Sequence, residues 1–126
     1  MIFKGISKTF SLKNEDQYNT IGEFWDELSL RYGLENLMGL GYKWDGGIIY
    51  YAIGLKAGEI DGANLTVELP DDGWEVRAGL TDQLKEMYDD IYRDGALSLE
   101  LETFTDDGIC RIRYIRKQSL GKTEFL

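Results

Sequence analysis

The stretch LSLELETFTDDGICRIRYI, residues 97–115, contains two runs of alternating character on either side of an Asp-Asp-Gly turn. In the first run leucines occupy every second position, so one row of side chains is apolar and the other carries Glu100, Glu102 and then Phe104. This alternation predicts two strands, and the turn between them predicts a hairpin. The pattern leaves open whether the acidic row faces water or lines a site for a positively charged partner.

A helix and a further strand are expected just before this hairpin. Residues 74–80 read as a strand after the turn PDDG, residues 70–73. In residues 81–95 the apolar side chains recur at helical spacing, with Thr81 or Asp82 as the N-cap and Gly95 as the stop. The residues of this apolar stripe are Leu84, Met87, Tyr88 and Ile91.

The N-terminal half repeats the same order. A strand over residues 2–10 precedes a helix over residues 20–33, whose stripe is Ile21, Phe24, Trp25 and Leu28. Two strands, residues 37–44 and 48–55, then form a hairpin across Asp-Gly-Gly. The halves match at an offset of 62 residues at the pairs Gly33 with Gly95, Asp45 with Asp107, and Gly46 with Gly108.

Two successive βαββ units predict an α+β fold. We expect duplicated βαββ units with their antiparallel strands in one sheet or two facing sheets. Two helices should pack on one side, leaving a central ligand cleft near the pseudo-twofold axis. Residues 1–116 are expected to form a single domain, and residues 117–126 a C-terminal tail that is loose or covers an edge or the cleft.

Composition narrows the function classes. The chain of 126 residues carries a net charge of −9, so the phosphate backbone of a nucleic acid would be repelled and direct nucleic-acid binding is not expected. It contains no histidine and one cysteine, Cys110, which excludes a Cys/His zinc site and His-based nucleophilic catalysis within one chain. No apolar run approaches a membrane span and no secretory leader is evident, so we expect a cytoplasmic protein without membrane contact and without a cofactor.

The ordered segments EFWDELSLRYG, GLGYKW, IIYYAIG, ELPDDGWEVRAG, LKEMYDDIY and ELETF resemble the GyrI-like, or AraC-type, effector-binding domains, which share the SOUL-type fold. The resemblance runs from about residue 3 to residue 116, and it is to the stand-alone form without a helix-turn-helix domain. It implies a cleft between two βαββ repeats, lined by aromatic side chains and holding a key glutamate. The family motif resembles Phe-Glu-x-Tyr and matches residues 101–104, so the glutamate role falls on Glu102. Leu101 and Phe104 depart from the motif, and Phe104 lacks the hydroxyl.

Six residues are candidates for ligand binding: Glu102, Glu100, Trp25, Tyr50, Trp74 and Phe104. A buried carboxylate needs a cation or hydrogen bonds to offset its desolvation, whereas an exposed strand glutamate needs neither. Tyr50 and Tyr51 point to opposite faces of their strand. Tyr50 is preferred for the cleft because small residues on its face leave room, while Tyr51 shares the core face with two isoleucines. Tyr42 and Trp44 are expected on one face of the preceding strand.

These residues favour a binding module for a small, lipophilic compound, preferably a cation, that acts as a sensor or a sequestering protein. Aromatic rings attract cations through their faces, although the same rings would also accept a neutral flat molecule. One alternative is a hydrolase of strained electrophiles, as in some stand-alone relatives, with Glu102 as base or nucleophile and Tyr50 or Tyr51 as acid. Another is a gyrase-inhibitor-like module that acts on a protein partner. The oligomeric state stays open.

Overall fold

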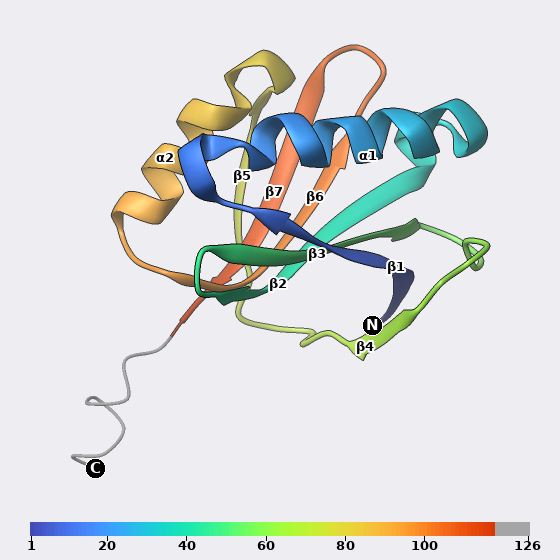
Figure 1. The fold of residues 1–126 in the computed structure, drawn as a ribbon, viewed down its shortest axis with the longest axis horizontal. Helices are drawn as coiled ribbons and strands as arrows, with labels where there is room; N and C mark the ends of the chain where they lie inside the picture. Colours follow the sequence, from blue (N-terminus) through green and yellow to red (C-terminus); the bar gives the residue numbers. More distant parts are fainter. Residues whose placement is uncertain (118–126) are drawn as a thin grey trace.

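Strand pairing follows the repeated order of the sequence. The computed structural model describes residues 1–117, in which seven antiparallel strands form one sheet in the order β4-β1-β3-β2-β6-β7-β5 (Figure 1). The first unit comprises β1 (Ile2–Ser11), α1 (Gln17–Tyr32), β2 (Leu37–Asp45) and β3 (Ile48–Leu55). The second comprises β5 (Glu75–Leu80), α2 (Leu84–Arg93), β6 (Leu97–Phe104) and β7 (Ile109–Arg116). A short extra strand, β4 (Leu65–Glu68), lies between the units in sequence and pairs with β1.

The sheet is nearly symmetric about its centre. The order β1-β3-β2 on one side is matched by β5-β7-β6 on the other, and the two units meet where β2 pairs with β6. Both helices lie over the same face of the sheet (Figure 1). The α+β prediction is therefore confirmed, with a single sheet rather than two facing ones.

The helices bury the stripes that their spacing predicts. α1 buries Phe24, Trp25 and Leu28 and ends before Gly33, whose φ of 88° suits glycine at a helix end. α2 buries Met87, Tyr88 and Ile91. The predicted caps of α2 are wrong, because residues 81–83 form a 3-10 turn (Thr81–Gln83) and the helix begins after it at Leu84. Two more 3-10 turns, Lys13–Glu15 and Leu34–Asn36, flank α1.

Irregular pairing in the two central strands changes which side chains share a face. The register of β2 against β3 shifts between Gly41 and Lys43, and that of β6 against β7 shifts between Leu97 and Leu99. Such a β-bulge re-aims the side chains that follow it. Tyr42 and Trp44 consequently belong to opposite faces, contrary to the sequence expectation, and Leu97 packs on the helix face.

Both faces of the sheet carry apolar clusters. The larger cluster lies between the sheet and the helices and includes Tyr51, Ile53, Ile91 and Ile112. The smaller one, on the other face, consists of Phe3, Leu40, Ala52, Leu69 and Leu101 with partly buried neighbours. The central strands β2 and β6 therefore contribute buried side chains to both faces of the sheet.

Within residues 1–117 the structure contains no helix that is both long and apolar enough to cross a membrane. The expected behaviour of the C-terminal tail concerns residues 118–126, which lie outside the described residues.

Candidate ligand-binding site

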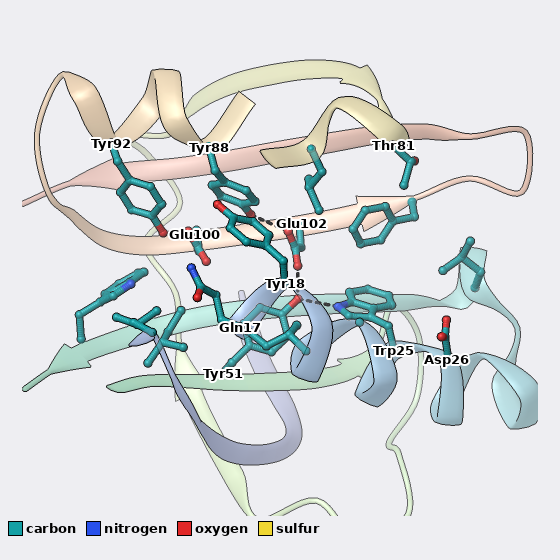
Figure 2. A pocket seen from close by; sticks show the side chains of 18 residues that line it. Gln17, Tyr18, Trp25, Asp26, Tyr51, Thr81, Tyr88, Tyr92, Glu100 and Glu102 are labelled. Atoms are coloured by element: carbon teal, nitrogen blue, oxygen red, sulfur yellow. Dashed lines mark hydrogen bonds between the residues drawn. The ribbon is translucent and has the colours of Figure 1, made fainter. Parts of the chain in front are cut away.

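A cavity of about 540 Å³ opens between the two helices and the helix-facing side of the sheet (Figure 2). Its walls come from α1, α2, β2, β3 and β6, so both βαββ units contribute. The lining is mostly apolar and rich in rings, namely Tyr18, Trp25, Trp44, Tyr51, Tyr88, Tyr92 and Phe104. A concave aromatic site with a few polar groups is typical of small-molecule binding.

Glu102 lies at the centre of a chain of hydrogen bonds. The indole Nε1–H of Trp25 donates to the hydroxyl of Tyr51 over 2.7 Å, and that hydroxyl donates to Oε1 of Glu102. Tyr88 donates to the other oxygen, Oε2, over 2.5 Å (Figure 2). The carboxylate is only 4% exposed, so these donors supply much of the solvation that burial removes.

Glu100 belongs to the same row but has a different partner. Tyr92 donates to its Oε2 over 2.7 Å, and the side chain is likewise 4% exposed. Tyr88 and Tyr92 lie four residues apart on α2, a rise of roughly 6 Å, while Glu102 and Glu100 lie two residues apart on β6, roughly 6.6 Å. These similar spacings let one helix face present a hydroxyl to each carboxyl group.

Two glycines of β2 provide the room for these groups. Gly39 pairs with Glu102 and Gly41 with Glu100 across the central ladder. A Cβ atom at residue 39 would collide with the Tyr51 hydroxyl and lie 2.7 Å from the Trp25 ring, and one at residue 41 would lie 2.7 Å from Glu100 Cγ. Any larger residue at either position would push the polar groups away from the floor of the cavity.

The electrostatics of the site favour the neutral form of both acids. Burial, followed by the charge of Glu102, raises the pKa of Glu100 to about 8, and the Tyr92 hydrogen bond opposes this shift. Burial also raises the pKa of Glu102, against the hydrogen bonds from Tyr51 and Tyr88. Burial first, and the nearby acids second, hold the pKa values of Tyr51 and Tyr88 well above their usual range.

No lysine or arginine lines this cavity within residues 1–117, and no ion pair to either acid forms there. No group of three or more metal-ligating side chains occurs in the same part of the chain. An organic cation entering the cavity would therefore meet two buried acids and could stabilise their ionised forms, which no lysine or arginine of residues 1–117 does from within the cavity.

Four of the six predicted residues line the cavity: Glu102, Glu100, Trp25 and Phe104. The Phe104 ring packs edge-to-face against Trp25, with ring centroids 4.8 Å apart and planes at 84°. In place of a hydroxyl at this position, the chain offers those of Tyr51 and Tyr88 to the carboxylate.

Tyr50 and Trp74 lie elsewhere, so their predicted place in the cavity is corrected. Tyr51 lines the cavity instead of Tyr50, because the core face and the cavity face of β3 are the same face. The Tyr50 ring lies 6.0 Å from that of Tyr42, on the other side. Trp74 donates to the carbonyl of Pro70 over 2.7 Å and borders a separate hollow of about 80 Å³.

The sequence carried signals for several residues that it did not assign to the site. Tyr88 fell in the predicted apolar stripe, yet Tyr88 and Tyr92 at an i, i+4 spacing place two hydroxyls on one helix face. Gly39 and Gly41 share one face of a strand, where glycine marks a close approach of another group. Gln17, Tyr18, Asp26 and Thr81 also line the cavity, and the sequence contains no comparable signal for them.

Comparison of the chain with protein-family models, curated proteins and solved structures yields no match, so the family resemblance rests on the sequence segments alone.

Proposed function

We propose that the protein is a cytoplasmic small-molecule-binding domain of the GyrI-like effector-binding type, which captures a lipophilic cation as a sensor or sequestering protein. The observation that carries the proposal is a pair of buried carboxyl groups, Glu100 and Glu102, on the wall of an aromatic cavity that no lysine or arginine of residues 1–117 enters.

Energetics support a positively charged ligand. Each buried carboxylate carries a desolvation cost of several kcal/mol unless charge or hydrogen bonds compensate it. The tyrosine donors compensate in part, and a ligand cation would add the missing opposite charge. Rings such as Trp25 and Tyr88 would contribute about 0.5–2 kcal/mol for each face presented to the cation.

The dimensions of the cavity support a small organic molecule. Its volume of about 540 Å³ lies within the ~300–1,000 Å³ range of small-molecule sites. The acids lie on β6 at the sheet side, and Tyr18 and Trp25 lie on α1 across from α2. A ligand with one charged end and an apolar or aromatic body would match this division.

The test is a titration of lipophilic cations and their neutral isosteres, followed by tryptophan fluorescence and by thermal shift. Trp25 and Trp44 line the cavity, so saturable quenching should accompany binding. Glu102→Gln should weaken cation binding at least about tenfold, or about 1.4 kcal/mol, because it removes charge while preserving shape. A ligand at 100 times its Kd should stabilise the protein by about 2.7 kcal/mol.

Trp74→Phe is the matched control, since this tryptophan lies outside the cavity. It removes background fluorescence and should leave the affinity unchanged. Equal affinity for cations and neutral isosteres, or an unchanged affinity in Glu102→Gln, would contradict the proposal of a cation site.

A second candidate function is hydrolysis of a strained electrophile. The observation in its favour is that Tyr51 and Tyr88 both donate to Glu102, which supplies the acid groups that such a reaction needs beside its base or nucleophile. This function predicts turnover that Glu102→Gln abolishes while substrate binding persists. Binding without turnover in the wild-type protein would exclude hydrolysis of the tested compound and favour the binding function.

A further inference from the structure

The two buried acids differ in how many of their oxygens are already bonded. Both oxygens of Glu102 accept a hydrogen bond, from Tyr51 and from Tyr88. Glu100 accepts one, from Tyr92 to Oε2. Its other oxygen, Oε1, lies against Gly41 and receives no hydrogen bond from any residue in the range 1–117. The protein therefore occupies both oxygens of Glu102, whereas one oxygen of Glu100 has no donor among these residues.

Other polar atoms in the cavity point to the same chemistry. Oε1 of Gln17 and Oγ1 of Thr81 are buried and have no hydrogen-bond partner among the described residues, and both side chains line the cavity (Figure 2). An amide oxygen can only accept, and a hydroxyl can do so. The groups left open in the cavity thus include acceptors, one of them a carboxyl oxygen.

The groups facing Glu100 supply no competing cation. Tyr88 and Tyr92 face it from α2, Tyr18 lines the cavity from α1, and Glu102 follows on β6. On β7 the paired residue is Tyr114, and the nearby Arg116 is engaged with Glu75, Asp94 and backbone carbonyls. A donor for the open oxygen has to come from the ligand.

We propose that Glu100 makes the direct hydrogen bond to the ligand and selects a protonated amine, carrying at least one N–H, over a quaternary ammonium. The inference rests on the proposed cation-binding function and names its substrate class: a primary, secondary or tertiary ammonium group on an apolar body. A quaternary nitrogen has charge but no N–H, so it leaves the Glu100 oxygen without a donor. Glu102 contributes attraction to both kinds of cation and discriminates little between them.

The experiment measures the Kd of 4-phenylbutylamine and of its N-methyl, N,N-dimethyl and N,N,N-trimethyl derivatives by calorimetry. In the wild-type protein the last methylation should lower affinity about tenfold or more, because it removes the final charge-assisted hydrogen bond. Each earlier methylation should change affinity less. In Glu100→Gln this final step should disappear, whereas Glu102→Gln should weaken the whole series by a common factor and keep the step.

The wild-type series alone tests the inference, so it does not depend on how well a variant folds. A smooth series without a final step, or a step that persists in Glu100→Gln, overturns the role of Glu100 while leaving cation binding intact. Equal binding of all four amines and of neutral 4-phenylbutanol overturns the proposed function itself. Failure of every compound to bind overturns both.

Discussion

Strands β2 and β6 hold equivalent places in the two βαββ units, yet β2 carries glycines where β6 carries glutamates. They pair at the centre of the sheet, where Gly39 lies across from Glu102 and Gly41 across from Glu100. Leu40 pairs with Leu101 between these two Gly–Glu pairs, and both leucines are buried on the other face of the sheet. One strand offers empty space and the other fills it with carboxyl groups, so a near-symmetric scaffold holds an asymmetric site.

The helices differ in the same way. α2 presents the hydroxyls of Tyr88 and Tyr92 to the acids, while α1 presents the indole of Trp25, which donates to the Tyr51 hydroxyl. A duplicated fold thus need not duplicate its site. The second unit supplies the two acids and the hydroxyls of Tyr88 and Tyr92, and the first supplies space, an aromatic wall and the hydrogen-bonded pair of Trp25 and Tyr51.

The largest expected effect is on folding stability, which Glu100 should make dependent on pH. The pKa of Glu100 is raised from 4.5 to about 8 in the folded protein, so the folded state binds more protons than the unfolded state between these values. The stabilisation is complete below about pH 4.5 and is lost as pH rises through 8, with a slope of up to about 1.4 kcal/mol per pH unit. Urea unfolding of the ligand-free protein from pH 5 to 8 measures this slope.

Glu100→Gln is the variant that isolates this contribution. It should flatten the pH dependence and be more stable than wild type at pH 8, because no buried charge forms there. Glu102 keeps its own raised pKa, so some slope should remain. Parallel wild-type and variant profiles would mean that Glu100 titrates normally.

On the glycine side, Gly39→Ala should destabilise the protein by about 1–3 kcal/mol and abolish cation binding. The added methyl group would meet the Tyr51 hydroxyl and the Trp25 ring, which are held by their own packing. Chemical denaturation and ligand titration measure the two effects. Gly22→Ala is the control for stability alone, because this residue lines the cavity but its Cβ meets nothing within 4 Å, and the variant should stabilise α1 by about 0.5–1 kcal/mol. Similar losses in both variants would contradict the special role of residue 39.

Tyr51→Phe should cost about 1–2 kcal/mol, because Trp25 loses its acceptor and Glu102 loses one donor. The pKa of Glu102 should rise further for the same reason. The neighbouring Tyr50→Phe removes a hydroxyl on the other face that makes no hydrogen bond to residues 1–117, and should change stability by less than about 0.5 kcal/mol. Thermal unfolding of the pair decides whether the face of β3 is assigned correctly.

A smaller effect than that of Tyr51→Phe is expected for Trp74→Phe. Arg113 lies over the Trp74 ring at 5.2 Å, an interaction worth about 0.5–1 kcal/mol at such a site. Phenylalanine keeps a ring for Arg113 but loses the exposed hydrogen bond to the Pro70 carbonyl, so the variant should lose about 0.5–1 kcal/mol in urea unfolding. A larger loss would indicate that Trp74 and its small hollow are coupled to the cavity.

The sequence predicted the fold from local signals that act over a few residues. Alternation, helical stripes and glycine turns lie within each element, and their repetition yielded the two βαββ units. The bulges at residues 41–43 and 97–99 were not predictable in this way, because they arise from pairing between strands. Each bulge switches the face of the sheet on which the adjoining side chains lie. Trp44 and Leu97 therefore lie on the helix face and not, as expected, on the same face as Tyr42 and Leu99 respectively.

The candidate site was predicted in part for a related reason. Glu100, Glu102 and Phe104 lie on one strand, so alternation alone groups them. Tyr51 was assigned to a plain core because alternation cannot distinguish a filled interior from one that holds a cavity. The hydrogen bonds from Tyr88 and Tyr92 to the two acids depend on the angle and position at which α2 packs over β6. That packing is a tertiary feature, which the sequence pattern of one segment does not predict.

The ladder that joins the two units is short. β2 and β6 share three residue pairs, whereas β2 and β3 share eight. This seam runs beneath the cavity, and a molecule bound there would touch both units at once. A ligand that bridges the two βαββ units should suppress transient opening of the β2–β6 ladder. Deuterium uptake by the backbone amides of residues 39–41 and 100–102 should therefore report most sensitively whether the cavity holds a ligand.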